Sequence, residues 1–299
     1  VYKRQVLGEI KQKLGIDQLE PWDLSWAIDQ FVKPPDQHFP KEQMIPKVKE
    51  LVRSFGIIPE KLPILIKQAD IPFGGLCFAI KVPTDVRFVL NPRDGHRFYD
   101  TLFHEYGHAI HACFIQQQHF VLKNDIGCFN EGMATILEHF ATDPDWLREN
   151  TSLSDTEILR FVKAEKAARL LTLRSLMATS TFEFLAFEDL NQDLNELWSK
   201  TQAKYLYVSE NLTPQWAAHS IFTTHPIHVQ NYILAEMIAA QTIAYLQQNY
   251  GRLLNNAEVS KFLIENYYGP GASIDWPEKI ERATGQKLNA RALAQELVA

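Results

Sequence analysis

Long amphipathic segments dominate this sequence. Apolar residues recur at three- and four-residue spacing in residues 41–55, 155–189 and 228–248, and in the last two the apolar stripe runs for many turns. This spacing places apolar side chains along one face of an α-helix, which can then pack on a core. We therefore expect a mainly α protein whose architecture consists of long helices.

Nothing in the sequence divides this helical pattern into separate parts. The chain has 299 residues, of which 46% are hydrophobic, so it can bury a sizeable core. It contains no repeat, low-complexity tract or linker-like segment, and we expect one large helical catalytic domain over residues 1–299. The chain begins with Val in a helix-like pattern, which indicates the C-terminal part of a longer protein.

Charge and cysteine usage exclude several kinds of partner. The net charge is −6 and no run of Lys and Arg offsets it, so a nucleic-acid partner is not expected. No segment approaches the ~18 consecutive apolar residues of a membrane span, and residues 1–15 do not resemble a signal peptide. Cys77, Cys113 and Cys128 lack C-x-x-C spacing and are expected to be buried free thiols, which fits a reducing, cytoplasmic location.

One segment, residues 76–91, departs from the helical pattern. Two runs rich in β-branched and aromatic residues flank residues 82–85 (VPTD), a composition that favours a turn between strands. We expect a small antiparallel β-sheet there. An exposed edge strand of such a sheet could pair with an extended peptide, or the hairpin could merely cover the core.

The sequence HEYGH at residues 104–108 carries the clearest chemical signal. His104 and His108 are four residues apart, so on a helix of ~3.6 residues per turn both imidazoles project from the same face and can reach one ion. Glu105 lies beside that face, where it could take a proton from water at the metal. Gly107 costs helix stability, which close packing would explain. We expect a helix over residues 99–115.

A catalytic zinc needs a third protein ligand and an open fourth position. Glu131 is the best candidate, because residues 116–125 can form a loop and residues 127–141 (GCFNEGMATILEHFA) a second helix that returns to the first. Glu138 lies two turns further on the same side and could orient a histidine, as could Asn130. The alternative is that these residues are polar side chains satisfied between two packed helices. His111 and His139 are expected to be packing or surface residues.

A second polar cluster lies at residues 219–232 (HSIFTTHPIHVQNY). Zinc peptidases usually add a positioned donor for the oxyanion that forms when a peptide carbonyl is attacked. Tyr232 and one of His219, His225 and His228 could supply it. The alternative is a helix N-terminus after Pro226 with incidental polar residues.

The motifs HEYGHAIHA and NEGMA resemble those of zinc peptidases of the gluzincin type, in the thimet oligopeptidase and oligoendopeptidase F family and the related angiotensin-converting enzyme family. The similarity extends over most of the chain. The oligopeptidases have segments similar to PWDLSWA and DQHFPKEQMIPKVKELVRSFGI, and the converting enzymes have one similar to DVRFVL. YILAEMIAAQ resembles the helix with the oxyanion tyrosine, and YYGPGASIDWPEKIERATGQ resembles the closing segment of both families.

This resemblance implies a role for each matching residue. It makes His104, His108 and Glu131 the ligands of one zinc ion per chain, Glu105 the general base and acid, and Tyr232 the oxyanion donor. The spacing before Tyr232 matches neither family, and His225 is preferred over His219 and His228. Thr135 also departs, since the converting enzymes have an acidic residue there. Members of these families are longer, and an N-terminal helical lobe forms the opposite wall of a deep channel. This channel admits only short peptides.

The predicted function is zinc-dependent hydrolysis of peptide bonds in short peptides. A second possibility is a zinc hydrolase of another amide, such as an acylated amino acid. A third is a non-catalytic peptide-binding protein descended from a peptidase, although it would have no physical need of the intact H-E-x-x-H.

Overall fold

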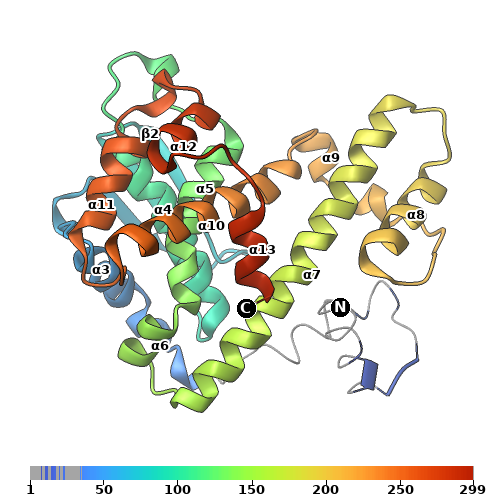
Figure 1. Ribbon diagram of the computed structural model, residues 1–299, viewed down its shortest axis with the longest axis horizontal. Helices are drawn as coiled ribbons and strands as arrows, with labels where there is room; N and C mark the ends of the chain where they lie inside the picture. The colour runs from blue at the N-terminus through green and yellow to red at the C-terminus, as the bar shows by residue number, and fades with distance from the viewer. Residues whose placement is uncertain are drawn as a thin grey trace. The chain divides into compact units, whose positions relative to one another are not determined.

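The computed structural model describes residues 36–298 together with Gly8, Lys11, Gln12, residues 15–17, Glu20, Asp23 and Pro34. The predictions for residues 1–15 and for PWDLSWA at 21–27 lie largely outside these residues. The described part is mainly α, as predicted (Figure 1). Its α-helices are α3 (Met44–Ser54), α4 (His96–Phe114), α5 (Gly127–Glu138), α6 (Pro144–Asn150), α7 (Asp155–Glu188), α8 (Leu194–Leu206), α9 (Ile221–Thr224), α10 (Gln230–Tyr250), α11 (Ala257–Leu263), α12 (Trp276–Thr284) and α13 (Arg291–Val298).

The remaining elements are short. The strands are β1 (Ile64–Gln68), β2 (Gly75–Lys81) and β3 (Asp85–Leu90). The other short helices are η1 (Asp36–His38), η2 (Lys41–Gln43), η3 (Pro59–Lys61), η4 (Phe120–Leu122), η5 (His139–Thr142), η6 (Gln215–Ala218), η7 (Ile264–Tyr268) and η8 (Gly271–Ser273), of which η7 is a π-helix. Within residues 36–298, none of the helices combines the length and apolar composition that crossing a bilayer needs.

The five helices predicted from periodicity and motif are confirmed. Residues 41–55 form η2 and α3, and the long stripes at 155–189 and 228–248 correspond to α7 and α10. The two helices expected to carry the metal ligands are α4 and α5, and a loop containing η4 joins them. At the predicted C-terminal end of the second helix, α5 tightens into η5.

The sheet has three strands in the order β1–β3–β2. The antiparallel pair predicted for residues 76–91 is confirmed, with Cys77 opposite Phe88. The strand β1 was not predicted, and it pairs with β3 in parallel. Ile64 of β1 packs with Val86, Ala109 and Ala112, so β1 completes the sheet face that covers α4.

The described residues belong to two compact units. One comprises residues 34–162 and 234–294, and the other comprises residues 1–33, 163–233 and 295–299. We refer to them as the larger and the smaller unit. The expectation of a single catalytic domain over residues 1–299 stays a prediction.

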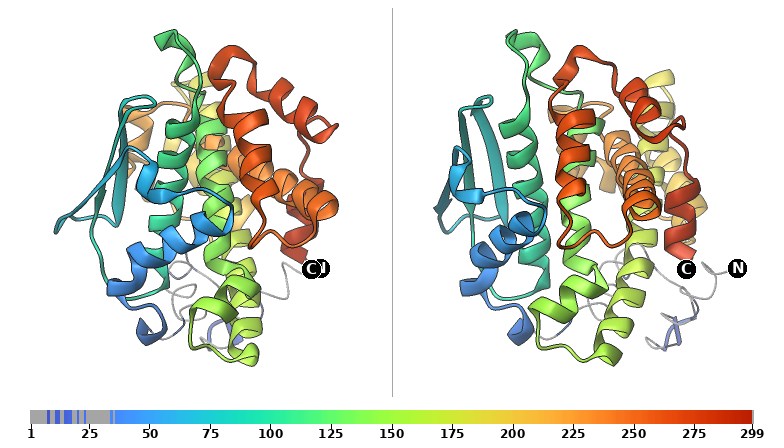
Figure 2. Two further views of the ribbon diagram at one scale, coloured as in Figure 1. Left: turned by 90° about the vertical axis from the view of Figure 1, so that its left-hand side faces the viewer. Right: turned by 60° about the vertical axis from the view of Figure 1, so that its left-hand side comes forward.

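The larger unit is layered around α4. Its sheet packs on one side of α4 and α5 packs on the other, as both views in Figure 2 show. Helix α4 contributes Tyr99, Leu102, Phe103 and Tyr106 to the core, at the spacing of one helical face. Trp146 of α6 packs edge-on against Phe103 at a ring-centroid distance of 5.1 Å.

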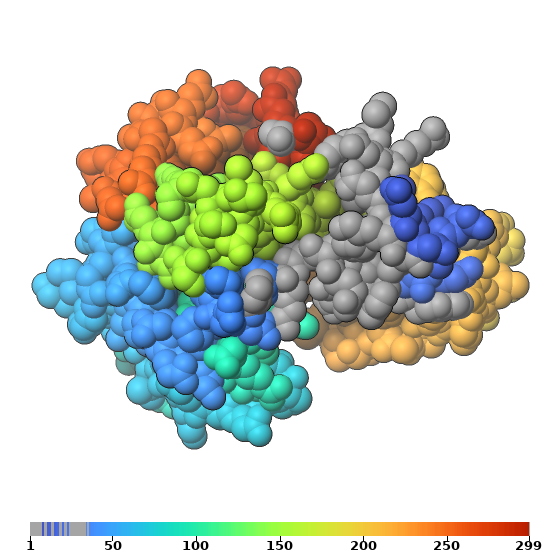
Figure 3. Space-filling view, turned by 90° about the horizontal axis from the view of Figure 1, so that it is seen from below, coloured from blue at the N-terminus to red at the C-terminus, as the bar shows by residue number. Residues whose placement is uncertain are grey.

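Helix α6 closes one face of this larger unit. Asp143 caps it by accepting hydrogen bonds from the N–H groups of Asp145 and Trp146. In Figure 3, the yellow-green residues around α6 lie between the blue segment after residue 36 and the orange segment near α11. Arg252 connects the orange segment to α6, where it donates to Asp145 at 3.0 Å and also to Glu149.

The smaller unit has its own apolar core. Phe182 and Ala186 of α7 are buried with Trp198 of α8. Trp216 and Phe222, from η6 and α9, pack against this group. The segment that carries the second polar cluster is thus part of a packed aromatic core.

Candidate metal centre

The structure brings together the three residues predicted as metal ligands. His104 and His108 come from α4 and Glu131 from α5, and one potential ligand atom from each lies within 4.8 Å of the others. Glu131 Oε2 is 3.3 Å from His104 Nε2 and 3.7 Å from His108 Nε2. Tetrahedral zinc, with ligands at ~2.0–2.2 Å, separates its donor atoms by roughly 3.3 Å. The donor set and its spacing therefore fit a zinc ion.

The close approach of α4 and α5 depends on Gly107. A Cβ atom at this position would lie 2.7 Å from Ala134 Cα, a distance that real contacts do not reach. Gly107 therefore allows the backbones of α4 and α5 to touch between the two histidines. This explains why a residue that disfavours helices lies inside the motif.

His104 is oriented by Glu138, one of the two residues suggested for this role. Its Nδ1–H donates to Glu138 Oε2 at 2.7 Å, which leaves Nε2 directed at Glu131. Burial disfavours the charged imidazole, but the carboxylates of Glu138 and Glu131 outweigh burial and raise the pKa of His104 well above its ordinary value.

His108 is oriented by Asn130, the other residue suggested. Asn130 Oδ1 lies 3.3 Å from His108 Nδ1, and because an amide oxygen can only accept, Nδ1 carries the hydrogen and Nε2 is left for a metal. Burial and the positive charge of His104 lower the pKa of His108 to about 4. A neutral imidazole of this tautomer is the form that binds zinc.

Glu105 points toward the sheet, roughly 100° around α4 from His104. Its Oε2 accepts a hydrogen bond of 2.8 Å from the backbone N–H of Cys77 in β2. Burial raises the pKa of Glu105, although His104 and the Cys77 N–H oppose this rise. The carboxylate is thus anchored beside the ligands but is not among them, as a general base requires.

A group of buried residues behind the ligands was not predicted. His111, expected to be a packing or surface residue, is 2% exposed and lies between Asn130 and Asp125. Burial by itself would raise the pKa of Asp125, but the contacts with His111 and Lys279 outweigh burial, and the pKa is lowered. For Lys279, burial lowers the pKa. No local motif marks Asp125 or Lys279, because they meet only in the folded chain.

The structure also shows the surroundings of Thr135 and the state of the three cysteines. Thr135, the position at which the converting enzymes have an acidic residue, donates from its hydroxyl to the carbonyl of Glu131 at 2.9 Å. Cys77, Cys113 and Cys128 are free thiols, as predicted; Cys128 is buried and the other two are half-buried.

The residues proposed for the oxyanion all lie in the smaller unit. The ring centroid of His228 is 5.5 Å from that of His225 and 5.5 Å from that of Tyr232. The ring of His219 instead packs at a tilt against Trp198, with the ring centroids 5.5 Å apart. The roles of Tyr232 and His225 stay predictions.

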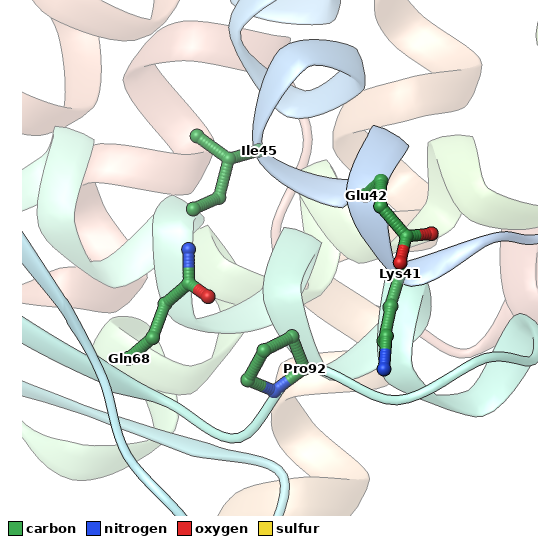
Figure 4. Close-up of a pocket in the computed structure, with 5 residues that line it drawn as sticks. All are labelled: Lys41, Glu42, Ile45, Gln68 and Pro92. Atoms are coloured by element: carbon green, nitrogen blue, oxygen red, sulfur yellow. The ribbon is translucent and has the colours of Figure 1, made fainter.

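A surface pocket of the larger unit lies near the end of β1. It is lined by Lys41, Glu42, Ile45, Gln68 and Pro92 (Figure 4). None of the candidate ligands contributes to its lining. This pocket is therefore separate from the candidate metal centre between α4 and α5.

Comparison with known proteins identifies the family. The model of Peptidase family M3 matches residues 88–299, which include both ligand helices. The chain belongs to this family. The M3 match covers well over half of the sequence and agrees with the resemblance to the oligopeptidases. None of the curated protein sequences is similar enough to match the chain.

Solved structures share the fold of this M3 member. The M32 carboxypeptidase from Deinococcus radiodurans R1 is 18% identical, with a TM-score of 0.67 over 99% of this chain. Metallocarboxypeptidase 1 of Trypanosoma cruzi is 15% identical, with a TM-score of 0.70, also over 99% of this chain. The chain spans 65% and 62%, respectively, of the length of these two proteins.

Proposed function

We propose that this M3 family member is a zinc-dependent peptidase that hydrolyses peptide bonds in short peptides. The observation that carries the proposal is the convergence of His104 Nε2, His108 Nε2 and Glu131 Oε2 at a spacing suited to one tetrahedral ion. Both histidines donate through Nδ1 to side chains of α5, so both Nε2 atoms are available to the metal.

The three ligands and Glu105 have separate parts in the proposed chemistry. Zinc bound by the three ligands would polarise the scissile carbonyl and lower the pKa of a water molecule toward ~7. Glu105 accepts the proton of the attacking water at Oε1, because Oε2 is engaged by Cys77, and later delivers it to the leaving amine. Its raised pKa makes Glu105 a stronger base than an exposed carboxylate.

Strand β2 offers a place for the substrate backbone. It pairs with β3 on one side only, so among the described residues it is an edge strand. The N–H of Cys77 donates to Glu105 and not to β3, so the free edge of β2 and the proposed base are adjacent. An extended peptide could add to this edge with its scissile bond near the metal.

Tyr232, helped by His225, is assigned to the oxyanion that forms when the carbonyl is attacked. For Tyr232 this assignment rests on the sequence resemblance of residues 232–241 and on family membership, whereas the choice of His225 is not supported by matching spacing. The cytoplasmic location also stays a prediction.

The test compares Glu105→Gln with Glu60→Gln, a surface control. Products from a peptide library are mapped by mass spectrometry, and metal content is measured on the same samples. We expect Glu105→Gln to lower turnover by roughly 10²–10⁴-fold while one zinc per chain remains. Full activity of this variant would refute the role of Glu105, and a wild-type chain without zinc would refute the metal centre.

A further inference from the structure

A chain of buried polar side chains connects the C-terminal part of the larger unit to His108. Lys279 of α12 and Asp125, in the loop before α5, form an ion pair with Nζ 2.5 Å from Oδ1. The Lys279 side chain is 0% exposed and that of Asp125 is 3% exposed. The second carboxylate oxygen of Asp125 lies 3.2 Å from His111 Nε2. Three titratable groups that the proposed reaction does not use are therefore linked in the interior.

The chain of contacts continues to the candidate ligand. His111 Nδ1 is 3.2 Å from Asn130 Oδ1, the same oxygen that lies 3.3 Å from His108 Nδ1. One amide oxygen thus accepts from two imidazoles, and His111 meets Asn130 and Asp125 through its two nitrogens. The ordered sequence of contacts is Lys279, Asp125, His111, Asn130 and His108.

Aromatic rings pack against this series of polar side chains. Lys279 Nζ is 4.2 Å from the ring centroid of Phe129, and the ring of Tyr268 lies 5.1 Å from that of His111. In such surroundings the desolvation of two charges offsets most of their attraction, and well-packed apolar residues are often as stabilising as an ion pair. Stabilisation of the fold therefore does not by itself explain why these buried residues are present. Their effect on the orientation of the Asn130 side chain does.

We propose that His111, Asp125 and Lys279 are positioning residues for the metal centre, which hold the Asn130 amide with its oxygen toward His108. A side-chain amide can rotate to exchange its oxygen and its NH₂ group. The NH₂ group would face the Nδ1–H of His108 donor to donor, and the imidazole would lose the tautomer that leaves Nε2 for zinc. The hydrogen bond from His111 Nδ1–H favours the oxygen at this place. Because the carboxylate of Asp125 also only accepts, His111 donates from both ring nitrogens, and Asp125 with Lys279 holds it in this form.

This inference rests on the proposed function, and its test measures zinc affinity in the full chain. The network variant Asp125→Leu/Lys279→Met removes both charges together, so that neither is left unpaired in the interior. We expect its zinc dissociation constant, from competition with a chromophoric chelator, to rise about 10-fold, as for other groups that orient metal ligands. An unchanged constant would overturn the proposal.

A double-mutant cycle separates positioning from general destabilisation. If the network acts through the amide, combining the network variant with Asn130→Ala weakens zinc binding no further than Asn130→Ala alone. Additive losses would overturn the proposal. Thr284→Val is the matched control, because Thr284 is also a buried residue of α12 but accepts a hydrogen bond from Gln241 instead. An equal loss of affinity in this control would also contradict positioning.

A second pair of variants applies if the network variant does not fold. His111→Ala removes the donor to Asn130, whereas His111→Asn places an amide N–H near the position of Nδ1. We expect about 10-fold weaker zinc binding for His111→Ala, recovery in His111→Asn, and a visible spectrum of the Co²⁺-loaded chain that changes only in the former. If His111→Ala binds zinc as tightly as the wild type, this inference fails alone. If the wild type binds no zinc, the proposed function fails.

Discussion

The two histidines assigned to the metal are supported differently by the same helix, α5. His104 donates at 2.7 Å to the carboxylate of Glu138, whose side chain is 31% exposed. His108 donates at 3.3 Å to the neutral amide of Asn130, behind which the polar groups are buried. Near solvent a charged acceptor keeps part of its hydration, whereas an unpaired interior charge is costly. The type of acceptor therefore follows the local access of water.

This difference in support also shifts the pKa values of the two imidazoles in opposite directions. Despite burial, the carboxylates raise the pKa of His104, whereas burial lowers that of His108 to about 4. A proton therefore competes with zinc more strongly at His104 than at His108. One ligand is held by charge and the other by geometry.

The largest effect is expected from a change that disturbs both histidines. Gly107→Ala places a methyl group against the backbone of Ala134, which cannot move aside as a flexible side chain could. We expect the free energy of unfolding of the zinc-free chain to fall by about 3 kcal/mol, which outweighs a helix-propensity gain of ~1 kcal/mol. Urea denaturation measures this change.

Gly132→Ala on α5 is the control for this substitution, since the nearest atoms to its new methyl group belong to the side chain of Ile238, at 3.0 Å, and not to a backbone. An equal effect of the two alanines, or none at Gly107, would contradict the close backbone contact of α4 with α5 at Gly107.

A third histidine of α4 tests whether burial lowers a pKa as argued for His108. The His96 N–H donates to the carbonyl of Ala141 at 3.0 Å, and burial lowers the pKa of His96 to about 4. The unfolded chain binds a proton at His96 below about pH 6.5, but the folded chain does so only near pH 4, so stability falls as the pH falls through this window. Between pH 7 and 5 this group alone should lower the free energy of unfolding by about 2 kcal/mol.

His96→Gln should remove that part of the pH dependence, whereas His119→Gln, at an exposed position, controls for the loss of a histidine. The measurement is the urea midpoint at the two pH values. Identical pH dependence in His96→Gln and the wild type would contradict burial as the cause.

The smallest effect is expected from neutralising the more exposed acceptor. Glu138→Gln keeps an oxygen for His104 Nδ1–H but removes the charge that supports the ring. We expect zinc affinity to fall about 10-fold, or ~1.4 kcal/mol. Chelator competition measures it, with Glu60→Gln as a surface control. An unchanged affinity would mean that geometry alone supports both histidines.

Helix periodicity was enough to predict the main elements of the fold. The stripe at 155–189 corresponds to α7, because a long apolar stripe has few alternatives to a packed helix. The strand β1 was missed, because a run as short as ILIKQ does not distinguish a strand from a turn of helix. Its parallel pairing with β3 depends on a partner about twenty residues away.

The candidate ligands and base were predictable for a related reason. His104, Glu105 and His108 lie within five residues, so helix geometry alone sets their relative directions. Glu131 required one further assumption, that the second helix returns to the first, and its carboxylate does lie near both imidazoles. Asp125 and Lys279 are separated by 154 residues and carried no local signal.

By itself, the sequence determined the helices and which side chains can share one ion, because both properties follow from spacings of a few residues along a regular backbone. Only the tertiary structure decided what stands behind each histidine: a partly exposed carboxylate at one ring, and at the other an amide backed by a buried lysine and aspartate. Such contacts depend on which distant segments exclude water from the same place, and no local pattern encodes that.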